Sequence, residues 1–407
     1  MALNLGTILS TSAADRPERP VLRLGERVMG YAELDRAARG FATSLREQGV
    51  SPGDRVALMI PNVPEFTIAY FGILYAGGIV VPLNVLLTAP EVRYHLEDSE
   101  ARLLVAHPLF GEPARQGAEQ AGAPIVWTSG DAEPNVAGYA AAEPLDALWS
   151  TQPDDTAVIL YTSGTTGKPK GAELTHANLL LNCTLVVPKL LPLGPDDVAL
   201  ATLPLFHSFG QTCIQNTTIA VGGSFTLLPR FTPEDAFEIM QRDRVTLFAG
   251  VPTMYFALLN HEGGERYDLS ALRYCMAGGA ALPVEVMRAF EKKYPVRILE
   301  GFGLSETSPV ASFNMMDRPR KPGSIGYPVW GVEMCILDDE DRPVANGEPG
   351  EICIRGHNIM KGYLKRPDAT KETLRGGWFH SGDIGNRDAD GCFTIVDRKK
   401  DMIIRGG

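Results

Sequence analysis

The stretch "YTSGTTGKPKG", residues 161–171, places three glycines, four serine or threonine residues and two lysines within eleven positions. Glycines let backbone N–H groups approach a ligand closely, and the hydroxyl groups add further hydrogen-bond donors. Lys168 and Lys170 add positive charge. This combination favours the binding of phosphate, although a flexible surface turn has a similar composition.

The loop differs from the common phosphate-binding pattern G-x-x-x-x-G-K-[ST]. Gly164 and Gly167 are two residues closer together, and Pro169 follows Lys168 where that pattern has a hydroxyl for magnesium. Proline has no hydroxyl and would not continue a helix there. The apolar run "TAVILYT" before the loop predicts a buried strand. A loop that follows a buried strand and carries two lysines fits a phosphate site better than a surface turn.

Two further side chains could do chemistry, but each also has an ordinary structural explanation. His207 lies between Phe206 and Phe209 in "PLFHSFG", where a histidine is often a partly buried, hydrogen-bonded residue. Asp383 in "HSGDIG" has the position of a residue that caps a turn. Neither residue identifies a function by itself.

Composition and charge limit the classes of function. The chain has 407 residues, more than one ordinary core, so at least two packed units are expected. The formal net charge of -11 argues against non-specific nucleic-acid binding, which needs a basic surface. The six cysteines form no C-x-x-C pair and no group with metal-ligand spacing, and the N-terminus lacks a signal-peptide pattern. We therefore expect a reduced, cytoplasmic protein.

Hydrophobic periodicity predicts the elements that position these residues. Within residues 1–160, short apolar strands alternate with helices, which indicates a first α/β subdomain. Residues 161–323 continue this alternation, and many of their strands end in glycine or polar residues. Residues 324–396 carry short strands and little helix. We expect an α/β fold of stacked, doubly wound, mostly parallel sheets with helices, followed by a small β-rich, barrel-like subdomain.

One apolar run, residues 66–82, is nearly long enough to span a bilayer. Gly77 and Gly78 divide it into a predicted helix and a short strand, and the segments around it are typical of βα units. We therefore expect membrane contact to be peripheral at most.

The loop "YTSGTTGKPKG" resembles the signature loop of the adenylate-forming superfamily, which includes acyl-CoA synthetases, aryl-CoA ligases, beetle luciferases and peptide-synthetase adenylation domains. Five further motifs follow in the order of that family. They are "PLFHSFG" at 204–210, "GFGLSET" at 301–307, "GEICIRG" at 350–356, "HSGDIG" at 380–385 and "DRKKDMIIRGG" at 397–407. The motifs cover essentially the whole chain, and six motifs in order are far more specific than one.

The resemblance implies a two-step reaction that uses ATP, Mg²⁺ and coenzyme A. A carboxylate attacks the α-phosphorus of ATP, which gives acyl-AMP and pyrophosphate. The thiol of coenzyme A then attacks the acyl carbon and expels AMP. Residues 163–168 would hold the phosphates that leave, because stabilising charge on the leaving group is the main electrostatic task in such a transfer.

The roles known in the family transfer to matching positions of this chain. Glu306 matches the magnesium carboxylate, and with His207 and Ser305 it forms the expected catalytic set. Ser305 stands where the family usually has threonine, and Phe302 stands where tyrosine is common, so a phenolic hydrogen bond is lost. The expected nucleotide contacts, including the adenine-lining residues 278–280 and the ribose-binding pair near the C-terminus, are Thr162, Ser163, Gly164, Thr165, Thr166, Gly167, Lys168, Lys170, Gly278, Gly279, Ala280, Glu300, Gly301, Phe302, Gly303, Leu304, Asp383 and Arg398.

The acyl pocket is expected at strand ends whose residues are small or apolar. The segments that would form its walls contain no Lys or Arg for a second carboxylate, and "HSFG" offers no acidic residue for an ammonium group. A neutral hydrophobic acid remains, as in fatty acyl-CoA synthetases, with the aryl acids of 4-coumarate-type ligases as the close alternative. The expected pocket residues are His207, Phe209, Gly210, Val251, Thr253, Met254, Tyr255, Gly279, Gly303 and Pro309.

In the family, a hinge and a small C-terminal domain follow the last motif. Lys400 matches the hinge position within residues 397–407, so the resemblance implies that this chain lacks the small domain and its catalytic lysine. Two other functions stay open: a ligase that loads a carrier protein, and a nucleotide-binding sensor without turnover. The oligomeric state also stays open, with a homodimer as one option.

Overall fold

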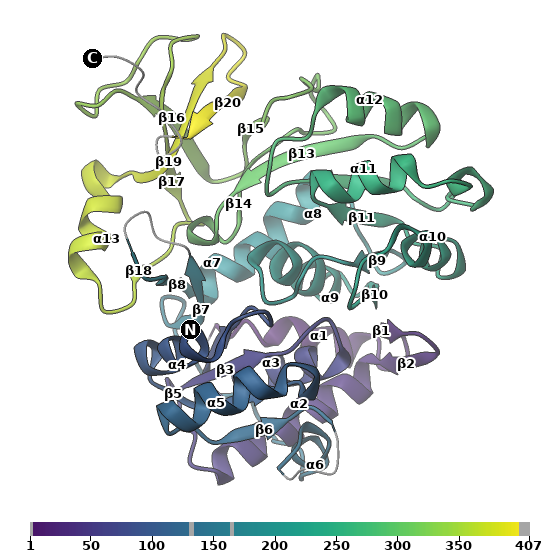
Figure 1. Ribbon diagram of the computed structural model, residues 1–407, viewed down its shortest axis with the longest axis vertical. Helices are drawn as coiled ribbons and strands as arrows, with labels where there is room; N and C mark the ends of the chain where they lie inside the picture. Colours follow the sequence, from purple (N-terminus) through teal and green to yellow (C-terminus); the bar gives the residue numbers. More distant parts are fainter. Residues whose placement is uncertain (1–2, 130–133, 163–166, 399–407) are drawn as a thin grey trace.

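The computed structural model describes residues 3–129, 134–162 and 167–398, in which three β-sheets form the framework (Figure 1). The seven-stranded sheet has the order β18-β8-β7-β4-β3-β5-β6. Its strands β3 to β7 are parallel, whereas β8 and β18 are antiparallel to their neighbours. The bounds are β3 Arg55–Met59, β4 Ile79–Pro82, β5 Ala101–Ala106, β6 Ile125–Trp127, β7 Thr156–Thr162, β8 Lys170–Thr175 and β18 Gly362–Tyr363.

The nine-stranded sheet has the order β15-β14-β13-β12-β11-β9-β10-β1-β2. Strands β9 to β13 and β1 are parallel, and antiparallel strands complete both edges. The bounds are β1 Pro20–Leu24, β2 Arg27–Gly30, β9 Val198–Ala201, β10 Ser224–Leu227, β11 Leu247–Gly250, β12 Tyr274–Ala277, β13 Ile298–Gly303, β14 Val310–Phe313 and β15 Tyr327–Pro328.

A small antiparallel sheet of four strands, in the order β16-β17-β19-β20, forms a separate part of the structure next to the two large sheets (Figure 1). The bounds are β16 Val332–Leu337, β17 Gly350–Gly356, β19 Phe379–Arg387 and β20 Phe393–Arg398, and helix α13 spans Pro367–Thr373. This sheet confirms the β-rich subdomain expected from the sequence.

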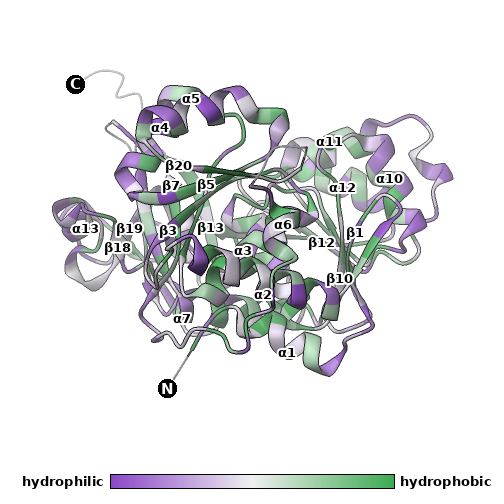
Figure 2. Cartoon of the chain, turned by 90° about the horizontal axis from the view of Figure 1, so that it is seen from below, coloured by the Kyte–Doolittle hydropathy of each residue, from purple (hydrophilic) through white to green (hydrophobic). Residues whose placement is uncertain are grey.

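Helices fill the space between the two large sheets and cover their outer faces. The central core joins residues of both sheets to helices α2 (Tyr31–Glu47) and α3 (Pro64–Ala76). Helices α4 (Ala89–Ser99) and α5 (Gly111–Ala121) cover the outer face of the seven-stranded sheet. Helices α10 (Pro233–Arg242), α11 (Pro252–Asn260) and α12 (Val284–Lys293) cover the outer face of the nine-stranded sheet. Figure 2 shows hydrophobic residues gathered on the strands and inner helices.

Several local predictions from the sequence are confirmed. Strands β1 and β2 form the expected hairpin around Gly25, whose φ of 55° lies in the left-handed region that a tight turn requires. Helix α2 buries the predicted stripe of Leu34, Ala38, Phe41 and Leu45 completely. The stripe therefore faces the central core, as its helical spacing indicates.

The long apolar run divides where the glycines predicted. Helix α3 ends at Gly77, whose φ is 85°, and strand β4 begins at Ile79. Within the described residues, no helix combines the length and the apolar character needed to cross a membrane.

The two large sheets include strands from outside the sequence ranges that were expected to form them. Strands β1 and β2 lie in the first 160 residues but join the nine-stranded sheet through β10. Strand β18 lies in the β-rich region but pairs with β8 of the seven-stranded sheet. The domain boundaries themselves stay a prediction.

Candidate active site

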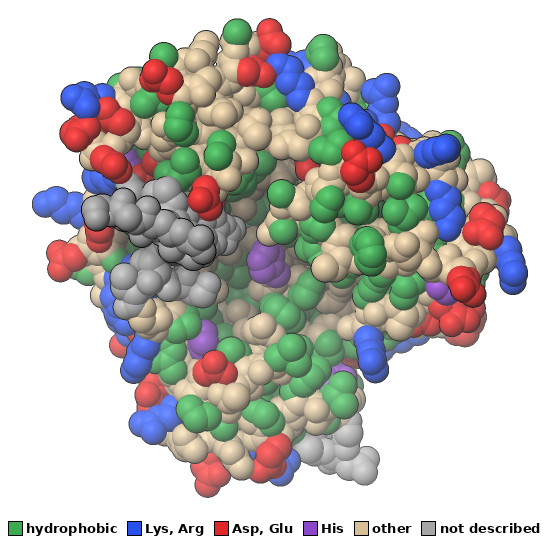
Figure 3. All heavy atoms as spheres, turned by 45° about the horizontal axis from the view of Figure 1, so that its top comes forward, with side chains coloured by type: hydrophobic (Ala, Val, Ile, Leu, Met, Phe, Trp, Pro, Cys, Tyr) green, Lys and Arg blue, Asp and Glu red, His purple; other side chains and the backbone are tan. Residues whose placement is uncertain are grey.

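A cavity opens at the carboxyl ends of parallel strands, where open α/β sheets bind ligands. The carboxyl ends of β12 and β13, the segments that follow β9 and β12, and strand β14 form its walls. Figure 3 shows the molecular surface hollowed in this region, with hydrophobic side chains around the hollow. The lining residues are His207, Ser208, Phe209, Cys213, Met276, Ala277, Gly278, Gly279, Gly301, Phe302, Gly303, Pro309, Val310 and Phe313.

Glycines permit the close packing of this wall. A Cβ atom at Gly303 would overlap the backbone carbonyl of Pro309, and a Cβ atom at Gly301 would lie 2.6 Å from Cδ2 of Phe313. Strands β13 and β14 could not approach each other in this way with side chains at both positions. The motif "GFG" therefore has a packing function in addition to any contact with a ligand.

His207 presents its imidazole to the cavity in a defined tautomer. Its Nδ1 accepts a hydrogen bond from the Phe209 backbone N–H at 3.3 Å, so the proton of the neutral ring lies on Nε2. The side chain keeps solvent-accessible surface, yet the surrounding protein removes enough water to lower the pKa of His207 below 6.5. A neutral ring with Nε2–H can donate to a carboxylate or acyl oxygen.

Half of the expected pocket residues line this cavity, and half do not. His207, Phe209, Gly279, Gly303 and Pro309 line it. The expected residues that are not among its lining residues are Gly210, Val251, Thr253, Met254 and Tyr255.

Tyr255 shows why a position near a strand end does not ensure contact with the cavity. Its side chain is fully buried, and its hydroxyl donates to the carbonyl of Met276 at 2.7 Å. It packs edge-on against Phe248 and Phe290 in the core under helices α11 and α12. Tyr255 therefore lies on the inner face of α11, where it packs into the core, and does not reach the cavity.

The structure adds wall residues that sequence reasoning did not identify. Cys213 lies four residues after Phe209 in the π-helix Phe209–Asn216, so both residues reach the same cavity. Met276 and Phe313 come from strands β12 and β14. The spacing of Cys213 was a usable signal, whereas Phe313 enters the wall through strand pairing that the sequence does not specify.

The loop that is expected to bind phosphate lies between the antiparallel strands β7 and β8, with Thr162 opposite Lys170. Ser163, Gly164, Thr165 and Thr166 lie outside the described residues. The ammonium group of Lys168 lies 5.0 Å from the centre of the Tyr94 ring, and that of Lys170 lies 5.1 Å from the centre of the Tyr363 ring. Both lysines therefore rest on aromatic faces, which favour a cation.

Two hydroxyl groups hold the carboxylate of Glu306 beside this loop. Its Oε1 accepts hydrogen bonds from Thr162 Oγ1 at 3.1 Å and from Tyr363 Oη at 2.9 Å. Glu306 is buried in the short 3-10 helix Ser305–Thr307. Burial, and then the neighbouring Glu306 carboxylate, raise the pKa of Tyr363, so its hydroxyl stays a donor.

Tyr363 is a site residue that the motifs did not reveal. It lies in β18, 57 positions after Glu306, and reaches the carboxylate because β18 pairs with β8 next to the loop. Its backbone N–H donates to Thr370 Oγ1 at 2.8 Å, which fixes β18 to helix α13. The tripeptide "KGY" gave no sign of this contact.

The expected adenine and ribose residues are distributed over two parts of the fold. Gly278 and Gly279 line the cavity and Ala280 follows them in an exposed position. Glu300 is buried, and its Oε2 accepts from the Gly323 N–H at 3.1 Å, while burial raises the pKa of Glu300. Its carboxylate therefore stabilises the turn at Gly323.

The expected ribose carboxylate, Asp383, is buried in β19 and lies opposite Arg398 of β20. This register brings together two residues that the motifs placed fifteen positions apart. The side chain of Arg398 and the whole of Lys400 lie outside what the structure describes.

The sequence profile described as AMP-binding enzyme matches residues 9–364 of this chain. The chain belongs to this family. Within the AMP-binding family it is similar to the long-chain-fatty-acid–CoA ligase of Bacillus subtilis (strain 168), at 37% identity over 437 residues, covering 99% of this chain and 78% of that protein. It is also similar to the feruloyl-CoA synthase of Amycolatopsis sp, at 39% identity over 394 residues, covering 96% of this chain and 78% of that protein.

Among solved structures, the fold matches that of the anthranilate CoA ligase AuaEII in complex with anthranoyl-AMP, with a TM-score of 0.95 and 29% identity, covering 100% of this chain and 80% of that chain. The expected resemblance to adenylate-forming enzymes is confirmed. As a member of the AMP-binding family, the protein is an AMP-forming acid–thiol ligase that uses ATP and coenzyme A.

Proposed function

We propose that this protein activates a fatty acid with ATP and transfers the acyl group to coenzyme A. The observation that supports this substrate is the chemistry of the cavity beside His207. Among the described residues that line it, none is Lys, Arg, Asp or Glu. A second carboxylate or an ammonium group on the substrate would lie there without a charged partner, at a cost of several kcal/mol.

Glu306 is proposed to bind Mg²⁺. A buried carboxylate held by the neutral hydroxyls of Thr162 and Tyr363, beside a loop with two lysines, offers the hard oxygen ligand that this cation prefers. A bound Mg²⁺ would help to disperse the negative charge of the phosphates. Thr162 and Tyr363 would orient the carboxylate, and Lys168 and Lys170 would attract the phosphates.

His207 is proposed to orient the reacting acid. The Nε2–H of its neutral ring would donate to one oxygen of the substrate carboxylate, which leaves the other oxygen to attack the α-phosphorus of ATP. Pyrophosphate leaves, and acyl-AMP forms. The thiol of coenzyme A then attacks the acyl carbon, its proton is lost, and AMP leaves. Asp383 would hold the ribose hydroxyls, and the Phe302 ring would stack on adenine.

An aryl acid is the second candidate substrate. Phe209 and Phe313 contribute rings to the cavity wall, and aromatic rings pack well against a flat aromatic acid. The similarity to feruloyl-CoA synthase and to an anthranilate CoA ligase also supports this candidate. Both candidates share the nucleotide chemistry and differ in the shape of the acid.

A panel of acids in the ATP–pyrophosphate exchange assay tests the proposed substrate. The panel contains saturated fatty acids of increasing length, cinnamic and benzoic acids, malonate and several amino acids. Fatty acids are expected to give the highest exchange rates. A preference for malonate or an amino acid would overturn the proposal, whereas a preference for the aromatic acids would select the second candidate.

The acceptor is tested in a separate experiment, because exchange reports adenylation alone. Mass spectrometry of products formed with coenzyme A or with a carrier protein identifies the thiol. Acyl-CoA is expected. Exclusive loading of the carrier protein would contradict transfer to coenzyme A. The absence of exchange with every acid, in a protein that also carries the small domain and catalytic lysine implied by the resemblance, would instead indicate a nucleotide-binding sensor.

A further inference from the structure

The strand that carries Asp383 is irregular next to that residue. In the pairing of β17 with β19, Cys353 lies opposite His380 and Glu351 lies opposite Ile384. Residues 381–383 of β19 therefore face the single residue Ile352 of β17. Such a bulge redirects side chains and takes backbone groups out of the regular strand pairing. Gly382, at its centre, has a φ of 76°, in the left-handed region.

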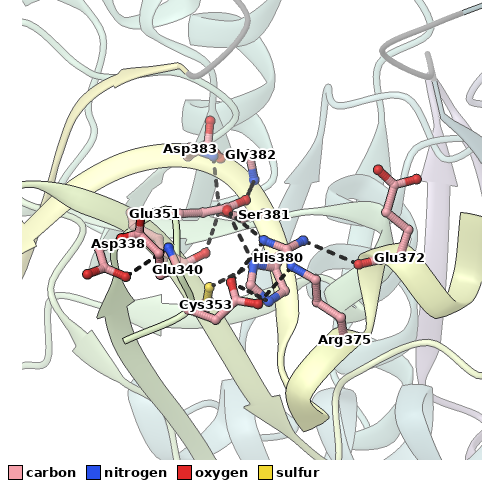
Figure 4. A network of polar contacts seen from close by, with 12 residues as sticks. Asp338, Glu340, Glu351, Cys353, Glu372, Arg375, His380, Ser381, Gly382 and Asp383 are labelled. Carbon is pink, nitrogen blue, oxygen red and sulfur yellow. Dashed lines mark hydrogen bonds and ion pairs between the residues drawn. The ribbon is translucent and has the colours of Figure 1, made fainter. Parts of the chain in front are cut away.

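Side chains hold this bulge in place. The N–H of Gly382 donates to Oε1 of Glu351 at 2.9 Å. The hydroxyl of Ser381 donates to the carbonyl of Ile352 at 2.7 Å and accepts from the N–H of Asp383 at 3.1 Å. Figure 4 shows Glu351 between Gly382 and the His380 ring. The carboxylate of Glu351 thus fixes the peptide unit between Ser381 and Gly382, one unit before the peptide bond to Asp383.

Glu351 is itself held by charged and polar neighbours. Its Oε2 lies 3.2 Å from Nδ1 of His380 and 3.5 Å from Nη2 of Arg375. Glu351 and His380 are both buried, so the pair is shielded from water. Arg375 also binds Asp341 through two hydrogen bonds of 3.0 and 3.1 Å. This arrangement compensates the buried charge of Glu351 and limits the movement of its carboxylate.

The same cluster has some features of a metal site. One ligand atom from each of Glu351, Cys353 and His380 lies within 4.8 Å of the others, and Sγ of Cys353 lies 3.3 Å from Nδ1 of His380. However, burial raises the pKa of the Cys353 thiol, and the thiolate is the form that binds metals. The guanidinium of Arg375 beside Glu351 would also repel a divalent cation. These observations favour a hydrogen-bonded network over a metal centre.

We propose that Glu351 is a positioning residue for nucleotide binding, which sets the direction of the Asp383 carboxylate by holding the Gly382 N–H. The proposal rests on the proposed role of Asp383 in binding the ribose. Glu351, the glutamate of "GEICIRG", lies in β17, the strand paired with the strand of Asp383. Its side chain accepts the Gly382 hydrogen bond that a backbone carbonyl would accept in a regular pair of strands. His380 and Arg375 keep this carboxylate in place.

Calorimetric titration with ATP and with 2′,3′-dideoxy-ATP tests the proposal without any turnover. Glu351→Ala removes the acceptor of Gly382 and is expected to weaken ATP binding roughly tenfold, as for the loss of one hydrogen bond to a charged group. Dideoxy-ATP has no ribose hydroxyls for Asp383 to hold, so Glu351→Ala and the wild-type protein are expected to bind dideoxy-ATP with the same affinity. Glu351→Gln keeps an acceptor oxygen and is expected to restore most of the ATP affinity.

Two further variants separate the possible results. Glu333→Ala removes a carboxylate of the adjacent strand β16 that pairs with Arg355 on the surface at 2.7 Å, and both nucleotides should bind normally. Asp383→Asn should weaken ATP but not dideoxy-ATP. If Asp383→Asn affects both nucleotides alike, the proposed ribose role fails, and the positioning role of Glu351 fails with it.

The positioning role can also fail alone. If Asp383→Asn discriminates between the nucleotides but Glu351→Ala weakens both equally, Glu351 has a general structural function. An unchanged ATP affinity in Glu351→Ala would likewise overturn the proposal. Stoichiometric zinc in the purified protein that is lost in Cys353→Ser would overturn it in another way, because Glu351 would then act as a metal ligand.

Discussion

Two regions of the molecule are built by different physical means: the surroundings of Glu306, proposed to bind the nucleotide (the nucleotide side), and the wall of the cavity proposed to bind the acid (the acid side). On the nucleotide side, Glu306 receives hydrogen bonds from residues of β7 and β18, and two lysines rest on aromatic rings. On the acid side, glycines of β13 and the rings of Phe209 and Phe313 shape a wall without charged side chains among its described residues. One side depends on electrostatics, and the other depends on shape.

This difference predicts how each side responds to substitution. A charge or a hydroxyl group in a buried site acts through a few strong interactions, so the loss of one atom is costly. An apolar wall acts through many weak contacts, so each atom contributes little. Substitutions on the nucleotide side should therefore have the larger effects.

The largest effect is expected for Glu306→Gln. The variant keeps the shape of the side chain but loses the charge proposed to bind Mg²⁺, so the rate of adenylation should fall by two orders of magnitude or more, about 3 kcal/mol. Pyrophosphate exchange across a series of Mg²⁺ concentrations measures this loss.

Glu173→Gln is the matched control for that variant. Glu173 lies on β8 and accepts a hydrogen bond from Thr156 Oγ1 at 3.0 Å, and no hydrogen bond that the structure describes joins its side chain to Glu306. It should retain wild-type exchange. If Glu306→Gln turned over normally at limiting Mg²⁺, the electrostatic description of the nucleotide side would be wrong.

A smaller effect is expected for Tyr363→Phe, which removes one hydrogen bond to Oε1 of Glu306 but keeps the ring beneath Lys170. The Mg²⁺ concentration for half-maximal exchange should rise roughly tenfold, because a hydrogen bond to a charged group contributes about 1.5–3 kcal/mol. Binding of Mn²⁺ with ATP, followed by electron paramagnetic resonance, should weaken by a similar factor.

Tyr161→Phe provides the control for Tyr363. The hydroxyl of Tyr161 donates to Oδ2 of Asp98 in helix α4 at 2.9 Å and makes no contact with Glu306 among the contacts that the structure describes. An equal change in Mg²⁺ requirement for both variants would mean that the phenols stabilise the loop in general and do not orient the carboxylate.

The two sides also differ in how far the sequence predicted them. The loop between β7 and β8, Glu306 and Asp383 lie in contiguous motifs, and their placement next to strands followed from local pattern. Tyr363 could not be predicted, because β18 pairs with a strand, β8, that lies about 190 positions earlier in the chain. A two-residue strand has no periodicity to read.

On the acid side, sequence reasoning identified strand ends but not side-chain directions. Tyr255 was expected in the pocket, but its side chain enters the core beneath α11. Phe313 was not expected, but the antiparallel pairing of β14 with β13 brings it to the wall. The direction of a side chain depends on packing between distant elements, which local pattern does not contain.

His207, which is proposed to orient the acid, gives a pH test of the acid side. Its lowered pKa keeps the ring neutral at pH 7, and a proton added to Nδ1 would break the hydrogen bond from the Phe209 N–H. The rate of adenylation should therefore be constant near neutral pH and fall below pH 6.5, by up to about tenfold per pH unit once the ring is protonated. Glutamine does not titrate, so the rate of His207→Gln should not show this fall below pH 6.5, the acidic limb of the pH–rate profile.

Acidification also lowers stability, which must be kept separate from catalysis. Because the folded pKa of His207 lies below the unfolded value of 6.5, the unfolded chain binds the proton more tightly, and the free energy of unfolding falls as the pH drops. Rates are therefore compared only where thermal denaturation shows the same folded fraction. An identical acidic limb in His207→Gln would assign the pH dependence to another group.

The smallest effects are expected for the shape of the acid wall. Each methylene of a fatty acid that becomes buried should improve kcat/KM by up to about 0.8 kcal/mol, roughly fourfold, until the cavity ends. Gly278 lines the cavity and is also one of the expected adenine contacts. Gly278→Ala would add a Cβ atom 3.1 Å from Cε1 of Phe209, which narrows the cavity at that point. In this variant, kcat/KM should therefore stop rising at a shorter fatty-acid chain length. The KM for ATP is measured in the same variant to show whether nucleotide binding has changed. Gly194→Ala, where a Cβ atom would have no neighbour within 4 Å, should keep the wild-type profile. If fatty-acid chain length had no effect on kcat/KM in any variant, the proposal that the apolar wall recognises the acid by its shape would be wrong.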